Sequence, residues 1–179
     1  MTHPIAVAVV LCGGVSSRMG RDKSALPFGA ESMLARVVRL AGRAADEVVV
    51  SGRRDAAPFG VTVIEDARPG RGPLVALVDA ATRLPAPWLL VVACDMPLLR
   101  PEVLALVRQA ADGHEACAPR LGGRPAPTCA AYRRDRVLAV APGLIGAGVS
   151  SLRGLLEALD TRYLDEADLR RADPDLLSF

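Results

Sequence analysis

The pattern of apolar and polar positions begins with a continuous apolar run over residues 5–11. Its small and mostly β-branched side chains, without a polar break, predict a strand that is buried on both faces. Three further apolar runs in the first half of the chain also predict strands, over residues 47–51, 61–65 and 88–93. These four strands are the framework on which the other predictions are built.

Apolar positions at helical spacing separate these runs and predict helices over residues 33–44, 73–83 and 101–111. Ser32 stands where an N-cap is expected, and Pro73 and Pro101 open the other two helices. The inward faces are predicted to contain Leu34, Val37, Val38 and Ala41 in the first helix and Leu74, Leu77 and Val78 in the second. Alternation of this kind predicts an α/β fold of three α/β/α layers around a mostly parallel sheet.

The second half of the chain is less regular. Strands are predicted over residues 115–119, 128–132 and 161–164, with a hairpin-like excursion over residues 120–127. A short helix over residues 134–140, a helix over 151–159 and a last helical turn or two over 166–172 complete the elements. With no internal repeat and no linker, residues 1–179 are expected to form one domain.

Composition narrows the possible functions. The chain has 22 basic and 20 acidic residues and a net charge of +2, which argues against a nucleic-acid-binding surface. No apolar run approaches the roughly 18 residues of a membrane span, and no signal peptide is expected at the start of the sequence. The four cysteines lack C-x-x-C spacing, which favours buried thiols in a reducing cytoplasm.

The strongest candidate for chemistry is the loop after the first strand, where residues 11–23 read L-C-G-G-V-S-S-R-M-G-R-D-K. Gly13 and Gly14 allow a ligand to approach the backbone, and consecutive N–H groups in such a turn bind anions. Arg18 and Lys23 add positive charge, so the loop suits the phosphates of a nucleotide. The spacing fits neither a P-loop nor a dinucleotide-binding fingerprint.

Lys23 is the only lysine of the chain. All the other residues counted among its 22 lysines and arginines are arginines. A lone ammonium suggests a site that requires a compact point charge in place of a guanidinium group. A solvated surface lysine is the alternative.

Two aspartates are predicted at the ends of strands, Asp66 after the third run and Asp95 after the fourth. Ligands of open α/β sheets bind beyond the carboxyl ends of the strands, so both should lie near the phosphate loop. A carboxylate that faces nucleotide phosphates is suited to hold Mg²⁺, and this predicts Asp95 as a metal ligand. Each aspartate could instead be a turn residue or a helix cap.

The loop resembles the signature L-x-G-G-x-S-x-R-M-G-x-D-K of nucleotidyltransferases with a Rossmann-like fold. Its paired glycines and its Asp-Lys ending are most similar to the molybdenum cofactor guanylyltransferases. The resemblance implies transfer of GMP from GTP to the terminal phosphate of (molybdo)molybdopterin, with release of pyrophosphate and with Mg²⁺ as cofactor. It also implies a nucleotide-binding half over residues 1–99 and an acceptor-binding half over residues 100–179.

The same resemblance assigns individual residues. Arg18, Lys23 and Asp95 would be catalytic, and Asp95 would also bind the metal, as the aspartate of the family's C-D-x-P tetrapeptide. The nucleotide-binding residues would be Leu11, Cys12, Gly13, Gly14, Lys23, Ser51, Asp66, Gly72 and Asp95. Ser51 stands where the guanylyltransferases often carry asparagine, which weakens the case for guanine. Arg124, in a segment that resembles the family's G-x-R near the acceptor, would meet a pterin phosphate; a solvated loop arginine is the alternative.

Three other interpretations stay open: a cytidylyltransferase, a transferase for another phosphorylated acceptor, and a nucleotide-binding module without turnover. Transient contact with molybdenum insertion proteins or molybdoenzymes would accompany the guanylyltransferase function. In the family, a segment like residues 173–179 leads into an N-x-N-T-P-x-D motif on the pterin side, and this sequence lacks that motif. We therefore expect weakened pterin binding, and we expect Leu176, Leu177 and Phe179 to begin a mobile, incomplete last strand.

Overall fold

The computed structural model describes residues 5–12, 26–52, 60–65 and 70–179. Its main sheet has the order β10-β7-β9-β6-β1-β4-β5. These strands are β1 (Ala6–Cys12), β4 (Glu47–Gly52), β5 (Thr62–Ile64), β6 (Trp88–Ala93), β7 (Ala116–Leu121), β9 (Cys129–Arg133) and β10 (Thr161–Leu164). Along this path only β9 runs antiparallel to its neighbours, so the predicted mostly parallel sheet is confirmed.

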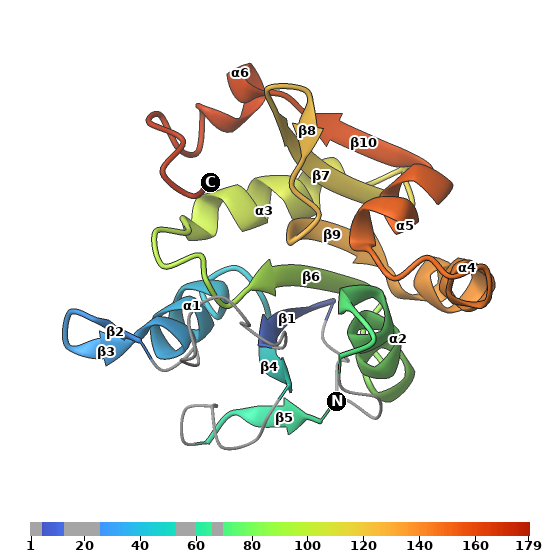
Figure 1. Cartoon of the computed structure of the whole chain (residues 1–179). Helices are drawn as coiled ribbons and strands as arrows, with labels where there is room; N and C mark the ends of the chain where they lie inside the picture. Colours follow the sequence, from blue (N-terminus) through green and yellow to red (C-terminus); the bar gives the residue numbers. More distant parts are fainter. Residues whose placement is uncertain (1–4, 13–25, 53–59, 66–69) are drawn as a thin grey trace.

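Helices cover both faces of the sheet, which gives the three predicted layers (Figure 1). One face carries α1 (Met33–Ala41), α3 (Pro101–Ala110) and α6 (Glu166–Leu169). The other carries α2 (Pro73–Arg83), α4 (Arg134–Gly146) and α5 (Leu152–Ala158). None of the helices in the described parts of the chain is long and apolar enough to cross a membrane.

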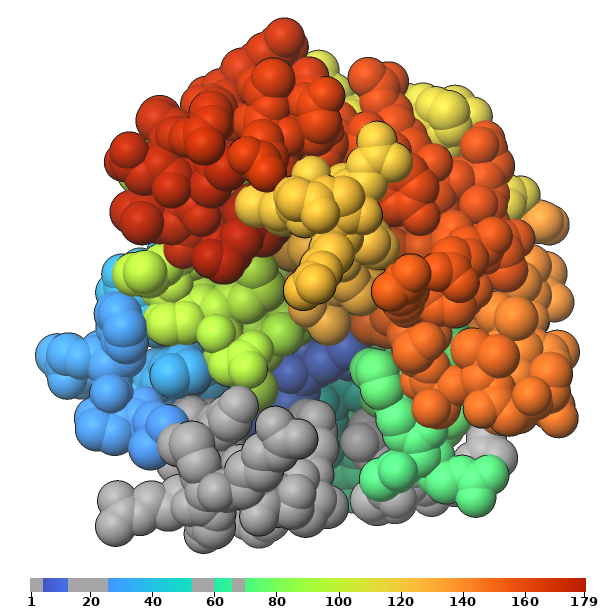
Figure 2. Space-filling view, turned by 45° about the horizontal axis from the view of Figure 1, so that its top comes forward, coloured from blue at the N-terminus to red at the C-terminus, as the bar shows by residue number. Residues whose placement is uncertain are grey.

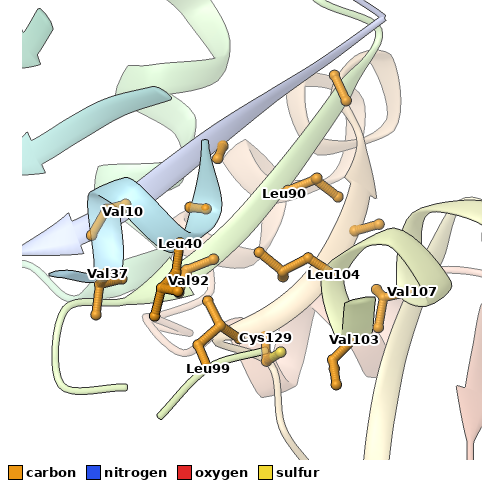
Figure 3. Packing of buried hydrophobic residues seen from close by; sticks show 14 of the residues in the cluster. Val10, Val37, Leu40, Leu90, Val92, Leu99, Val103, Leu104, Val107 and Cys129 are labelled. Carbon is orange, nitrogen blue, oxygen red and sulfur yellow. The ribbon is translucent and has the colours of Figure 1, made fainter. Parts of the chain in front are cut away.

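Strand β1 lies in the interior of the sheet, between β6 and β4, and contributes to both cores. Ala8 and Val10 belong to the cluster on the α1 and α3 side, whereas Val7 and Val9 belong to the cluster on the α2 side. All four are fully buried, and complete burial of a valine side chain contributes about 1.5–3 kcal/mol. Figure 3 shows the first cluster, in which Val10, Val92 and Leu104 come from β1, β6 and α3. The unbroken apolar run at the start of the sequence is thus explained by its interior position.

Helix α1 begins as predicted, because the Ser32 hydroxyl accepts a hydrogen bond from the Ala35 amide at 3.2 Å. The helix ends at Ala41, earlier than predicted, with Gly42 as its C-cap. Its buried face includes Leu40 in place of Val38, which is only partly buried. Just before α1, the chain forms the short hairpin of β2 (Pro27–Phe28) and β3 (Glu31–Ser32).

Helix α4 is longer than the predicted short helix and continues through Pro142. Its buried residues, Val137 and Ala141, are four positions apart and face the core that also contains α2 and α5. Proline removes one hydrogen bond from a helix interior. After Pro142, Leu144 and Ile145 also pack against this core, and this packing outweighs the local signal for an earlier end.

The prediction that Leu176, Leu177 and Phe179 begin a mobile last strand is wrong. Residues 170–179 form turns, and Leu176 has a left-handed φ of 53°, which is incompatible with an extended strand. The segment is tied to the start of α3, because the Ser178 hydroxyl accepts a hydrogen bond from the Arg100 amide at 3.0 Å. Arg100 Nε also lies 3.1 Å from Oδ1 of the buried Asp173.

Candidate active site

The register of the sheet brings three predicted site segments to one edge. Leu11 pairs with Ser51 on one side and with Ala93 on the other. The Cys94 amide donates to the Leu11 carbonyl at 3.1 Å, which continues the pairing one step beyond β6. The chain therefore leaves β1, β4 and β6 at the same level of the sheet, where nucleotide ligands of such folds bind.

Figure 2 shows a hollow over these strand ends, with the dark blue of β1 and the teal of β4 at its base. Around it lie the green segment before α2, the gold hairpin after β7, the orange segment before α5 and the yellow-green turn after β6. These bordering segments come from both halves of the sequence. The hollow is therefore assembled by the fold and is not the property of one motif.

Asp95 lies in the turn directly after β6, and its side chain is exposed. The described residues contain no group of three or more His, Cys, Asp or Glu that could hold a metal ion unaided. Mg²⁺ is usually held by one or two carboxylates together with phosphate oxygens of the substrate. One exposed carboxylate at the mouth of a nucleotide site fits such a substrate-completed metal site.

Ser51 and Gly52 end β4 beside the end of β1. Ser51 is only 1% exposed, so its hydroxyl lies within the packed edge of the sheet. Gly52 has a φ of 148°, and a Cβ there would collide with the Cys12 carbonyl. Sequence reasoning missed Gly52, although a glycine at the end of an apolar run is the available signal for close backbone contact.

Gly72 is the N-cap of α2, with a φ of 95°. A Cβ at this position would lie 2.8 Å from the Ser150 carbonyl oxygen, and the Leu74 amide donates to that same oxygen at 3.1 Å. Glycine is thus required by the approach of Ser150, which belongs to the turn between α4 and α5. Ser150 was missed because nothing local in the sequence links it to Gly72.

Arg124 lies on the short strand β8 (Arg124–Pro125), which folds back on β7, and its side chain is exposed. After β8 the chain returns to β6, where the Ala93 amide donates to the Thr128 carbonyl at 3.0 Å. The hairpin that carries Arg124 therefore leaves the same end of the sheet as Asp95. The role of Arg124 toward the acceptor stays a prediction.

Five predicted site residues lie outside the described residues: Gly13, Gly14, Arg18, Lys23 and Asp66. Their roles stay predictions. The flanking residues that the structure does describe are Leu11 and Cys12 before the phosphate loop and Leu26 after it.

The buried cysteines of the second half behave as core residues. Burial raises the pKa of both Cys117 and Cys129 to about 12. The reactive form of cysteine is the thiolate, so these two side chains stay protonated and unreactive at neutral pH. Both cysteines are therefore buried thiols, as predicted, whereas Cys94 is only partly buried.

Comparisons with known proteins point in the same direction. The model of the MobA-like NTP transferase domain matches residues 8–163. A probable molybdenum cofactor guanylyltransferase from Pelotomaculum thermopropionicum is 33% identical over 167 residues, covering 92% of this chain and 81% of that protein.

Two solved structures share the fold. Molybdopterin-guanine dinucleotide biosynthesis protein A from Archaeoglobus fulgidus has a TM-score of 0.77 at 25% identity, covering 97% of this chain and 90% of that one. Rv0371c from Mycobacterium tuberculosis, solved as a complex with manganese, has a TM-score of 0.65 at 22% identity, covering 96% and 98%. The fold, the matched domain and the identity to the Pelotomaculum relative agree, and the chain belongs to the MobA-like NTP transferase family and is a nucleotidyltransferase.

Proposed function

We propose that this enzyme transfers GMP from GTP to the terminal phosphate of (molybdo)molybdopterin, releasing pyrophosphate and forming the guanine dinucleotide form of the cofactor. The observation that carries the proposal is the meeting of three strand ends at the start of the L-C-G-G sequence, with exposed Asp95 beside them. The name of the Pelotomaculum relative supports both the nucleotide and the acceptor.

In this reaction, an oxygen of the acceptor phosphate attacks the α-phosphate of GTP, and the bond to pyrophosphate breaks. The protein contributes position and charge, with no covalent intermediate. Backbone amides of residues 11–14 would receive the nucleotide, and Arg18 and Lys23 would offset negative charge on its phosphates. Ser51, Asp66 and Gly72 would border the nucleoside.

Asp95 would hold Mg²⁺, which when bound neutralises phosphate charge that develops in the transition state. The exposed carboxylate of Asp95 supports this assignment because Mg²⁺ prefers oxygen ligands and keeps room for substrate phosphates. The manganese complex of the structurally similar Rv0371c supports a divalent cation in this fold.

Arg124 would bind the phosphate of the pterin from the hairpin on the other side of the hollow. A guanidinium group suits phosphate oxygens because it can donate two parallel hydrogen bonds. The exposure of Arg124 and its place at the carboxyl end of β7 support this role.

A cytidylyltransferase is the second candidate, and Ser51 is the residue that favours it. A hydroxyl can donate one hydrogen bond and can also accept, but it makes fewer bonds than the amide of the asparagine that guanylyltransferases often carry here, so Ser51 weakens the case for guanine. We propose GTP as the preferred substrate because the similar proteins are named guanylyltransferases. We also propose that the enzyme acts in the cytoplasm and makes transient contact with molybdenum insertion proteins or molybdoenzymes.

The test is to incubate the protein with Mg²⁺, purified molybdopterin and each of GTP, CTP and ATP, and to measure pyrophosphate and the dinucleotide product. We expect turnover with GTP well above that with CTP or ATP, and none without the acceptor. Equal or greater turnover with CTP would replace the proposal with the second candidate. Nucleotide binding without turnover would identify a catalytically silent binding module.

A further inference from the structure

The turn that carries Asp95 is held by helix α1 and by the C-terminal segment. On one side, Arg36 Nε of α1 donates a hydrogen bond of 2.6 Å to the Pro97 carbonyl. At the far end of the turn, the Arg100 amide donates to the Ser178 hydroxyl at 3.0 Å. Between them, Leu99 is 2% exposed and packs into the core cluster of Figure 3.

The Arg36 side chain is itself held in place by the hairpin of β2 and β3. Its Nη1 lies 3.3 Å from Oε1 of Glu31, and its guanidinium carbon lies 4.9 Å from the centre of the Phe28 ring. One guanidinium group therefore connects a carboxylate, an aromatic ring and the Pro97 carbonyl. The planar fork of arginine allows this, whereas an ammonium group is a single point charge.

These contacts join two parts of the site. In the sequence, the hairpin follows the phosphate loop of residues 11–23, and Pro97 comes two positions after Asp95. Arg36 thus links two segments: the hairpin of β2 and β3, which follows the phosphate loop, and the turn that carries Asp95. Small displacements matter here, because a misplacement of about 1 Å can lower a rate by about 100-fold.

We propose that Arg36 is a positioning residue that holds the Asp95 turn at the spacing required to bind the metal–nucleotide complex. This inference rests on the proposed role of Asp95 as metal ligand. The guanidinium group of Arg36 is engaged by Pro97, Glu31 and Phe28, so in this proposal it acts through the turn.

The chain offers a matched control in Arg39, one turn further along α1. Arg39 Nη2 lies 2.6 Å from the same Oε1 atom of Glu31. The hydrogen bond to Pro97, however, is made by Arg36. Arg39→Ala therefore removes a contact of Glu31 and leaves the link between α1 and Pro97 in place.

The experiment measures Mn²⁺ binding by electron paramagnetic resonance in the presence of a non-hydrolysable GTP analogue, for the full chain and for Arg36→Ala, Arg36→Lys, Arg39→Ala and Asp95→Asn. We expect about 10-fold weaker Mn²⁺ binding in Arg36→Ala, an intermediate loss in Arg36→Lys and no change in Arg39→Ala. Binding of the GTP analogue in the presence of EDTA should stay unchanged in all the arginine variants. Arg36→Lys keeps a cation at this position, so its Mn²⁺ binding can still be measured if the alanine variant does not fold.

The role of Arg36 would be overturned if Arg36→Ala binds Mn²⁺ normally while Asp95→Asn loses binding. If only Arg36→Lys folds, normal binding by that variant has the same meaning. Either result would leave the proposed function intact. Equal weakening in Arg36→Ala and Arg39→Ala would also overturn it, because Arg39 does not reach the turn. Normal binding by Asp95→Asn would overturn the metal role of Asp95 and, with it, this inference.

Discussion

The turn that carries Asp95 and the hairpin that carries Arg124 leave the same end of the sheet but are held in different ways. The first is fixed by hydrogen bonds to β1, α1 and the C-terminal segment, and it buries Leu99. In the second, Gly122, Gly123 and Arg124 are all exposed, and the Gly122 amide donates to the Glu166 carboxylate at 3.1 Å on the surface. Among the described residues, the Asp95 turn is thus tied to three parts of the fold, whereas the tip of the Arg124 hairpin projects into solvent.

The glycines show the same contrast. A side chain at Gly72 would collide with Ser150, but a Cβ at Gly123 would meet no atom within 4 Å. Tight packing at Gly72 would suit the proposed reaction, in which the α-phosphate must be presented in one orientation. An open hairpin suits an acceptor that can enter from solvent. The following predictions test this difference, from the largest effect to the smallest.

Asp95→Asn should lower the rate of GMP transfer by about 100- to 1000-fold, the scale observed for loss of one charge-stabilising group. The fold should be unaffected, because the side chain is exposed. The measurement is pyrophosphate release as a function of Mg²⁺ concentration. Asp112→Asn is the control, since Asp112 is 71% exposed near the other end of α3. An unchanged metal dependence in Asp95→Asn would move the metal ligand elsewhere.

Gly72→Ala should destabilise the protein more than Gly123→Ala does. Both glycines have a left-handed φ, 95° and 77°, which costs an alanine about 1–2 kcal/mol. At Gly72 the collision with Ser150 should add about 1–3 kcal/mol, the usual cost of overpacking. Urea unfolding of the two variants measures the difference. Equal free energies of unfolding would mean that the Ser150 turn moves aside without cost.

Ser178→Ala should lower the free energy of unfolding by about 1 kcal/mol, because the Arg100 amide loses its hydrogen-bond partner. It should also loosen the Asp95 turn, which ends at Arg100. Hydrogen exchange of the peptide over residues 94–104 would detect this as faster exchange. Exchange at the wild-type rate would show that Leu99 and Arg36 hold the turn without the C-terminal segment.

The Asp173 carboxylate adds a pH dependence to the same contact. Burial raises its pKa, but hydrogen bonds from Ser178 and Leu177 and the charge of Arg100 outweigh burial, so the pKa is lowered below 3.8. A lowered pKa in the folded state stabilises the protein above the unfolded value, and this stabilisation is lost as the pH falls through the folded value. Thermal unfolding should therefore show wild type losing stability below about pH 4 more steeply than Asp173→Asn. Parallel curves would contradict this.

Arg124→Ala should have the smallest effect. It should raise the KM for molybdopterin about 1.4- to 5-fold, in line with the value of about 0.2–1 kcal/mol for an exposed ion pair. The KM for GTP and the free energy of unfolding should not change. A loss of activity as large as that of Asp95→Asn would mean that the hairpin closes over the acceptor and is not an open surface.

Local patterns in the sequence determined most of the framework. The apolar run of β6 is long enough and rich enough in valine to specify a strand by itself, and its predicted bounds agree with the structure. The strand before a glycine-rich loop, and an aspartate after another strand, were sufficient to predict that both lie at the carboxyl edge. Ser32 as N-cap was equally local, because a cap bonds to an amide three residues away.

Other features were decided only by tertiary structure. Helix α4 continues past Pro142 because packing of Leu144 and Ile145 against the core outweighs one lost hydrogen bond, and no local rule weighs those two effects. The last residues form turns and not a strand because Asp173 and Ser178 find partners beside α3.

The same is true of the contacts that shape the site. Ser150 meets Gly72, and Arg36 meets Pro97, across long stretches of chain. A sequence shows which backbone conformations and which burial patterns are favourable, because those depend on neighbouring residues. It does not show which distant groups fill the last positions around a site, because that depends on how the completed layers pack against each other.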